Sequence, residues 1–210
     1  MPPVVLGTAG SAALGAAATR TFAKTGYGVV ITYSNNSSRA DSLVADVEKT
    51  SPLPKPEVGS GSNFPSIKVD LSKKTDVGRL VSEAVAGAGR LDVVFPNGGW
   101  TSITDLNVLD DVDEEMWDKC WNINVKSYLW MMHAKRKYLD DSQGCFITTA
   151  SLAGVRVSGS SVAYSFNKTA QIHLVKSPAM MVGPKTREWG LKCSEEKLDA
   201  SLLNTQLKRI

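Results

Sequence analysis

Tyr164 and Lys168 stand four residues apart in the stretch YSFNK. On a helix this spacing puts both side chains on the same face, one turn from each other. A free phenol ionises near pH ~10, so it is a poor acid or base at neutral pH. An ammonium one turn away stabilises the phenolate and would equip the tyrosine for proton transfer. The five letters alone leave two interpretations open, an acid–base pair and an ordinary helix surface, because this spacing often arises by chance.

Apolar segments rich in β-branched residues alternate along the chain with helix-like segments. The predicted strands are residues 4–7, 27–33, 66–70, 91–99 and 144–151. The predicted helices are residues 12–24, 38–50, 73–87, 113–139 and a segment that begins near residue 162, while the Pro-, Gly- and Ser-rich residues 51–65 form a loop. Ser37 or Ser38 is the predicted N-cap of the second helix. The alternation predicts a doubly wound α/β fold with a parallel sheet, in a single domain over residues 1–210.

A loop of small residues, GTAGSAALG, joins the first predicted strand to the first predicted helix. Backbone N–H groups in such a loop can approach a pyrophosphate, and the helix N-terminus then stabilises the negative charge. A plain strand-to-helix turn rich in small residues is an equally good interpretation of the loop alone.

The loop resembles the pattern Thr-Gly-x-x-x-Gly-Ile-Gly of the short-chain dehydrogenase/reductase family. Counting back from FAKTG at residues 22–26, Thr8 matches the threonine, Leu14 the isoleucine and Gly15 the third glycine. The resemblance implies a Rossmann-type fold and an NAD(P) site to which Thr8, Ser11, Leu14 and Gly15 contribute.

Two alanines depart from this pattern. Ala9 and Ala13 stand where the first two glycines are expected, and Gly7 and Gly10 do not fall on those positions. Alanine resists the positive φ that glycine tolerates. We therefore expect either a loop that adjusts around Gly7 and Gly10 or a reduced affinity for the cofactor.

Three further segments match the family in order. Asp70 in VDLS matches an aspartate that meets the adenine, although a turn or helix-cap aspartate is the alternative. Asn97 and Gly98 lie in PNGG, which resembles the family's Asn-Asn-Ala-Gly turn, with Gly98 in place of the alanine. Asn124 in WDKCWNINVKS falls at the position of the catalytic asparagine. Without the resemblance, Asn124 would be interpreted as a residue that interrupts helical hydrogen bonding.

Ser151 precedes Tyr164 by thirteen residues, which is the family's usual interval. The resemblance implies that Tyr164 exchanges a proton with the substrate oxygen while a hydride moves between the nicotinamide and the carbonyl carbon. It also implies that Ser151 holds that oxygen, that Lys168 binds the nicotinamide ribose, and that Asn124 holds a water linking Lys168 to solvent. The alternative is a Tyr–Lys helix face with an unrelated serine, which the ordered set of four residues disfavours.

The end of the second predicted strand bears on the choice of cofactor. In a protein that binds NAD, an Asp or Glu at the end of this strand would hydrogen-bond the ribose hydroxyl of the cofactor. Here the first acidic residue after the strand is Asp41. Ser34 and Asn35 can donate to a phosphate oxygen and Arg39 can pair with one, so the sequence favours NADP. A polar turn and helix cap is a compatible alternative. The full predicted cofactor-binding set is Thr8, Ser11, Leu14, Gly15, Ser34, Arg39, Asp70, Asn97, Gly98, Tyr164 and Lys168.

Composition and charge narrow the class of protein. A net charge of +3 gives no reason to expect a nucleic-acid or membrane partner. The basic run Lys135, Arg136, Lys137 is predicted to be a helix end that faces water. The chain shows no signal peptide and no apolar segment long enough to span a membrane, so a cytoplasmic location is expected.

The three cysteines lack metal-ligand spacing, so no metal site is predicted and reduced thiols in a reducing compartment are expected. They are Cys120, Cys145 and Cys193.

The resemblance covers roughly residues 4–183 and then breaks. A sixth strand and a Pro-Gly segment that would cover the nicotinamide are not recognisable between Lys185 and Arg187, and residues 185–210 are expected to be a divergent or truncated segment. Three hypotheses follow: an NADP-dependent oxidoreductase acting on a small carbonyl or alcohol, an impaired nucleotide-binding protein of the same fold, and a poorly folding fragment. A homodimer or homotetramer is implied by the resemblance.

Overall fold

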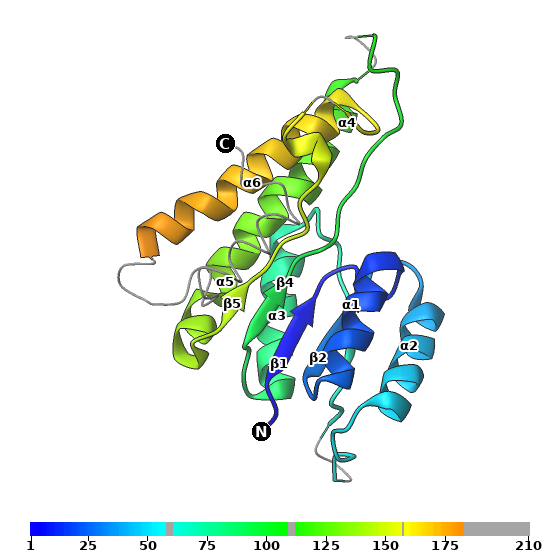
Figure 1. Ribbon diagram of the computed structural model, residues 1–210, viewed down its shortest axis with the longest axis vertical. Coiled ribbons are helices and arrows are strands. Elements are labelled where there is room, and N and C mark those ends of the chain that lie inside the picture. The colour runs from blue at the N-terminus through cyan, green and yellow to red at the C-terminus, as the bar shows by residue number, and fades with distance from the viewer. Residues whose placement is uncertain (58–60, 109–111, 157, 183–210) are drawn as a thin grey trace.

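Five parallel strands form one sheet in the order β3-β2-β1-β4-β5, and Figure 1 labels β2, β1, β4 and β5 of this sheet. They are β1 (Val4–Gly7), β2 (Gly28–Tyr33), β3 (Ser66–Lys68), β4 (Val93–Phe95) and β5 (Cys145–Phe146). The computed structural model describes residues 1–57, 61–108, 112–156 and 158–182. All five strands lie where the sequence predicts them, and the α/β prediction is confirmed. The predicted gap at the sixth strand and the segment 185–210 lie outside the described residues.

Six α-helices are described in this part of the chain. They are α1 (Ala13–Lys24), α2 (Ser37–Thr50), α3 (Lys74–Ala88), α4 (Glu114–Trp121), α5 (Ser127–Ser142) and α6 (Val162–Val182). A π-helical segment, Asn122–Lys126, joins α4 to α5, so the predicted helix over residues 113–139 is helical with one change of hydrogen-bond pattern. A short 3₁₀ turn, Leu152–Gly154, follows β5.

Helices cover both faces of the sheet. Because side chains alternate along a strand, Val5 packs with α1 and α2 while its neighbour Leu6 packs with α3 and α5. Buried aliphatic side chains from the helices pack against each face of the sheet, such as Leu43 of α2 on one face and Leu80 of α3 on the other. The inner strands β1 and β2 are thus buried on both sides, which explains why they appear in the sequence as continuous apolar runs.

The order of the strands reverses at β1. The chain moves outward from β1 to β2 and β3, and then returns to the other side of β1 with β4 and β5. The loops that leave the carboxyl ends of β1 and β4 therefore diverge, and the crevice between them is where open α/β sheets bind ligands. The predicted phosphate loop and the PNGG turn lie at these two strand ends.

The N-cap of α2 differs from the prediction. Ser37 and Ser38 are already helical, and Asn36 is the cap because its Oδ1 accepts a hydrogen bond of 2.9 Å from the backbone N–H of Arg39. An asparagine carbonyl fills this role as well as a serine hydroxyl does. Helix α2 begins at Ser37, one residue earlier than predicted, so the residue before it, Asn36, takes the place of the cap.

The prediction that the basic run ends a helix in water is wrong for Lys135. Helix α5 continues to Ser142, and Lys135 is fully buried with its Nζ 4.0 Å from the centre of the Phe146 ring. Burial lowers the pKa of Lys135 to about 6, because the charged form loses its hydration. Lys137 is exposed, as predicted.

Within the described ranges, no helix combines the length and the apolar character needed to cross a bilayer.

Candidate functional site

The loop after β1 has left-handed backbone at the two positions where alanine replaces glycine. Ala9 has φ 50° and Ala13 has φ 43°, whereas neither Gly7 nor Gly10 has a positive φ. The loop therefore does not adjust around the two glycines. It keeps a conformation that favours glycine and places alanine in it, at a cost of about 1–2 kcal/mol for each residue.

Gly15 lies against the backbone of this loop. A Cβ at Gly15 would stand 2.1 Å from the carbonyl oxygen of Ala9 and 3.1 Å from the Nδ2 of Asn97. Only glycine fits this contact, so the predicted role of Gly15 in the loop has a steric basis. Leu14, by contrast, extends into solvent at the start of α1 with 54% of its surface exposed.

Thr8 joins the ends of β1 and β4. Its buried Oγ1 accepts hydrogen bonds of 3.0 Å from the backbone N–H groups of both Asn97 and Gly98. Asn97 in turn accepts a hydrogen bond of 2.8 Å at Oδ1 from the hydroxyl of Thr149, which follows β5. The hydroxyl of Thr8 thus holds the PNGG turn in place, and its predicted contribution to a cofactor site would be through the position of that turn.

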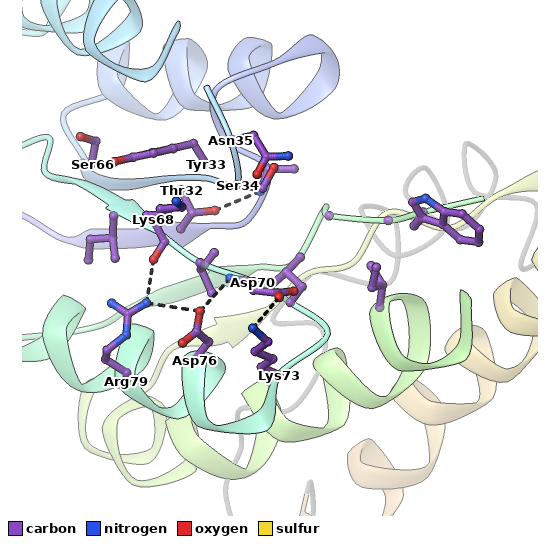
Figure 2. A pocket seen from close by; sticks show the side chains of 18 of the residues that line it. Thr32, Tyr33, Ser34, Asn35, Ser66, Lys68, Asp70, Lys73, Asp76 and Arg79 are labelled. Atoms are coloured by element: carbon purple, nitrogen blue, oxygen red, sulfur yellow. Dashed lines mark hydrogen bonds and ion pairs between the residues drawn. The ribbon is translucent and has the colours of Figure 1, made fainter. Parts of the chain in front are cut away.

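A cavity of about 810 Å³ opens at the carboxyl ends of β1, β2 and β4. Figure 2 shows Ser34 and Asn35 on one side of it and Asp70 on the other. Gly98 also lines it, so three members of the predicted set, Ser34, Asp70 and Gly98, come together here. Other lining residues include Ala9, Thr32, Leu71 and Trp100.

A second, smaller cavity of about 270 Å³ adjoins the first and shares Ser34 and Asn35 with it. Ser11 of the loop after β1 and Arg39 of the first turn of α2 also line it, together with the cap residue Asn36. The structure therefore brings Ser11, Ser34 and Arg39 together around one space, although they come from three different segments.

The carboxylate of Asp70 is held within its own turn. Its Oδ1 accepts hydrogen bonds from the backbone N–H and the hydroxyl of Ser72, at 3.0 and 2.7 Å, and its Oδ2 lies 3.4 Å from the Nζ of Lys73 (Figure 2). The hydrogen bonds from Ser72 lower the pKa of Asp70, and Lys73 adds to this effect. Asp70 is therefore a turn aspartate that also lines the large cavity.

Asn124 lies in the π-helical segment and is fully buried. Its side-chain amide makes two hydrogen bonds to the backbone of Trp100. The Oδ1 accepts from the N–H at 2.8 Å, and the Nδ2 donates to the carbonyl oxygen at 2.7 Å. The amide also donates to the Sγ of Cys120 at 3.0 Å. Its own backbone carbonyl accepts a hydrogen bond of 3.1 Å from the Nε2 of Gln171.

Lys168 is buried on α6, one turn after Tyr164. Its Nζ donates to the backbone carbonyl of Thr149 at 3.0 Å and to the Oε1 of Gln171 at 2.9 Å, and it lies 5.6 Å from the centre of the Tyr164 ring. Burial lowers the pKa of Lys168 to about 8, and the nearby thiol of Cys120 partly opposes this shift. The structure thus places the ammonium between the end of β5 and the tyrosine.

Ser151 lies at the start of the 3₁₀ turn, where its Oγ accepts a hydrogen bond of 3.2 Å from the N–H of Ala153. That turn is fastened to α6, because the hydroxyls of Ser165 and Thr169 donate to the carbonyls of Ala153 and Gly154 at 2.6 and 2.9 Å. Among the residues the structure describes, Ser151 and Tyr164 do not hydrogen-bond each other. They stand on two segments that pack together, and both are half-buried.

Sequence reasoning missed three groups at the site, namely Gln171, the carbonyl of Thr149 and Tyr128. A backbone carbonyl carries no sequence signal. Gln171 carries a weak one, because it stands three residues after Lys168 and so shares its face of α6. Tyr128, one turn after Asn124 in sequence, also was not singled out, and its hydroxyl donates to the carbonyl of Gly98 at 2.9 Å.

The short chain dehydrogenase family model matches residues 3–186. A 3beta-hydroxysteroid dehydrogenase 2 of Eggerthella lenta is 28% identical over 136 residues, which is 64% of this chain and 50% of that protein. A short-chain dehydrogenase/reductase of Pestalotiopsis microspora is 26% identical over 182 residues, covering 87% of this chain and 64% of that protein. The chain thus spans between half and two thirds of the length of these two relatives.

Among solved structures, an alcohol dehydrogenase from the archaeon Thermococcus sibiricus, complexed with 5-hydroxy-NADP, superimposes with a TM-score of 0.73 at 21% identity. The match covers 85% of this chain and 71% of that one, and it supports the fold. The family match extends over most of the chain and includes the loop after β1 and the helix that carries Tyr164 and Lys168, and this extent decides the family. The chain belongs to the short-chain dehydrogenase family.

Proposed function

We propose that this protein is an NADP-dependent oxidoreductase that interconverts a small carbonyl compound and the corresponding alcohol. The observation that carries the proposal is the buried ammonium of Lys168, fixed by the carbonyl of Thr149 and by Gln171 and placed 5.6 Å from the ring of Tyr164. A buried cation beside a phenol stabilises the phenolate, which proton transfer near neutral pH requires.

The residues have complementary roles in this reaction. In the reducing direction, the hydroxyl of Tyr164 gives its proton to the substrate oxygen, and the resulting phenolate is neutralised by Lys168 until a proton returns from solvent. The hydroxyl of Ser151 donates a hydrogen bond to the same oxygen and stabilises the charge that develops there. When bound, NADPH would supply the hydride for the carbonyl carbon, and NADP⁺ would take it up in the reverse direction.

The residues around the two cavities fit an NADP-type cofactor. Gly15 lets the first turn of α1 pack directly on the loop after β1, because any side chain there would meet the carbonyl of Ala9. Ser11, Ser34 and Arg39 surround the smaller cavity and would hold a 2′-phosphate through two hydroxyls and a guanidinium. Asp70 and Gly98 would line the adenosine side of the larger cavity. The relative complexed with 5-hydroxy-NADP is consistent with this choice.

A nucleotide-binding protein that does not turn over is the second candidate. The positive φ of Ala9 and Ala13 favours it, because backbone strain in the phosphate loop opposes tight binding of the cofactor. The ordered set of Ser151, Tyr164 and Lys168 favours the enzyme.

Consumption of NADPH, followed by its absorbance with a panel of ketones and aldehydes, tests the proposal. Wild-type protein should consume NADPH with at least one carbonyl, and Tyr164→Phe should be slower by about 100-fold or more. Calorimetry with NADPH separates the two candidates. Binding without turnover on any carbonyl would support the second, and equal rates in wild type and Tyr164→Phe would remove Tyr164 from the mechanism.

A further inference from the structure

We propose that Gln171 is a positioning residue for the Tyr164–Lys168 pair, and that its side-chain amide directly links the ammonium of Lys168 to the backbone of the π-helical segment at Asn124. The inference rests on the proposed function and deepens it, because it assigns the link between Lys168 and Asn124 to a residue of this chain.

The geometry of the link is complete at both ends. The Oε1 of Gln171 accepts from the Nζ of Lys168 at 2.9 Å, and its Nε2 donates to the carbonyl oxygen of Asn124 at 3.1 Å. All three residues are buried, with 1% of Gln171, 4% of Lys168 and none of Asn124 exposed. An amide offers one acceptor and one donor group in a fixed relation, so one side chain satisfies both a cation and a carbonyl.

Local structure explains why these groups meet. Gln171 and Lys168 are three residues apart on α6 and therefore share a face, and that face packs against the π-helical segment and α4. The π-helix departs from the hydrogen-bond pattern of an α-helix, and the carbonyl of Asn124 in its centre turns to a side-chain donor. Segments of this kind occur often at functional sites.

The link has a chemical consequence for Lys168. A hydrogen-bond acceptor placed at the ammonium favours its charged form, whereas burial favours the neutral amine. Gln171 therefore works against desolvation and keeps the charge beside Tyr164. The family resemblance implies that a water held by Asn124 connects Lys168 to solvent. In this structure the amide of Gln171 lies between Lys168 and Asn124 instead. An amide can hold the ammonium, but it exchanges protons far less readily than water does.

Other titratable groups also face this region, and the test must separate them from Gln171. Tyr164 lies on the same helix, Cys120 of α4 lies close enough to Lys168 that its thiolate would raise the pKa of the lysine, and Tyr128 contacts Gln171. Burial raises the pKa of both Cys120 and Tyr128, so both stay neutral through the neutral range. A change at Gln171 therefore acts on Lys168 without a third charge to complicate it.

The direct test is the pKa of Lys168 measured by NMR on protein labelled with carbon-13 at the lysine ε-carbon. Comparison with Lys168→Met assigns the signal. Gln171→Met keeps the length of the side chain and removes the amide, and it should lower the pKa of Lys168 by about one unit. Gln171→Asn, whose shorter amide cannot reach both partners, should give a smaller decrease and guards against a Met variant that fails to fold.

Asn167→Leu is the matched control. Asn167 is a fully buried amide on the same helix, and its Nδ2 donates to the carbonyl of Ala163 within α6. This variant should change thermal stability without moving the pKa of Lys168. If Gln171→Met leaves that pKa unchanged, or if Asn167→Leu lowers it equally, the proposal is wrong.

Kinetics then connect the link to turnover. With a carbonyl substrate of the wild type, Gln171→Met should displace the pH profile of NADPH consumption and lower kcat by about 10-fold with little change in KM, because the defect lies in proton transfer rather than in binding. Coincident pH profiles would contradict this part of the inference. A wild-type protein with no turnover on any carbonyl would instead overturn the proposed function, while the NMR measurement would still decide the link.

Discussion

The backbone of Gly15 lies so close to the carbonyl of Ala9 that a Cβ at Gly15 would stand 2.1 Å from that oxygen. The Ala9 atoms that this Cβ would meet belong to the main chain, so rotation of a flexible side chain could not relieve the clash. We predict that Gly15→Ala weakens NADPH binding by at least about 10-fold and destabilises the fold by about 1–3 kcal/mol. Calorimetry and denaturant unfolding measure the two effects.

Gly78→Ala provides the comparison for this variant. Gly78 is also a helical glycine, but a Cβ there would meet nothing within 4 Å. The substitution should stabilise α3 by up to about 1 kcal/mol and leave NADPH binding unchanged. Unchanged NADPH affinity in Gly15→Ala would show that the loop does not form the binding site.

The double substitution Ala9→Gly, Ala13→Gly should strengthen the same loop. Both positions have a positive φ, which glycine adopts without the steric cost of a Cβ. After the greater entropy of glycine in the unfolded chain is subtracted, we expect a gain of about 0.5–1 kcal/mol at each site and tighter NADPH binding. Thermal unfolding and calorimetry test this, with Ala17→Gly in the exposed middle of α1 as a control that should lose about 1 kcal/mol. A lower melting temperature in the double variant would exclude strain at these alanines.

Arg39 should determine the preference between NADPH and NADH. Its side chain lines the smaller cavity together with Ser11 and Ser34, where a 2′-phosphate would lie. Arg39→Ala should weaken NADPH binding by about 10-fold or more, because one charge-assisted contact is lost, and leave NADH binding nearly unchanged. Lys49→Ala, on the last turn of the same helix, removes a positive charge away from that cavity and should affect neither. Equal losses for NADPH and NADH in Arg39→Ala would argue against a phosphate at this place.

Lys135 should make stability depend on pH. Burial lowers its pKa in the folded protein from the ordinary value of 10.5 to about 6, so between these values the unfolded chain binds the proton and the folded chain does not. Stability contributed by this group is therefore complete above pH ~10.5, falls as the pH decreases, and is lost below pH ~6. Lys135→Met should raise the free energy of unfolding at pH 7 by about 1–3 kcal/mol and flatten its pH dependence.

The exposed neighbour Lys137 serves as the reference, since Lys137→Met should leave both quantities nearly unchanged. Denaturant unfolding from pH 6 to pH 9 is the measurement. A slope that persists in Lys135→Met would assign the pH dependence to another group.

Much of the fold follows from local pattern. The β-branched runs are buried on both faces of the sheet and therefore stand out from the amphipathic helices between them. Strand ends were less predictable, since β5 is paired only over Cys145 and Phe146 although the apolar segment is longer. The burial of Lys135 could not be predicted from the sequence. It depends on how α5 packs against the sheet, and a run of basic residues carries no information about that packing.

The site divides in the same way. Ser151, Tyr164 and Lys168 were singled out by their spacing within one strand–turn–helix segment, and their roles in catalysis stay a prediction. Thr8 was predicted as a cofactor contact, but its hydroxyl holds the turn at Asn97, a contact between residues 89 apart in sequence. Gln171 was not predicted, because its partners are selected by the packing of α6 on the π-helical segment.

Transfer of deuterium from NADPH that carries deuterium at both hydrogen positions of the nicotinamide C4, measured in the alcohol product by mass spectrometry, tests the central claim most directly. With a reactive carbonyl, the wild-type protein should place deuterium on the carbinol carbon, and Tyr164→Phe should do so more slowly by about 100-fold or more. Product without deuterium, or labelled product formed equally fast by Tyr164→Phe, would contradict hydride transfer assisted by the Tyr164–Lys168 pair.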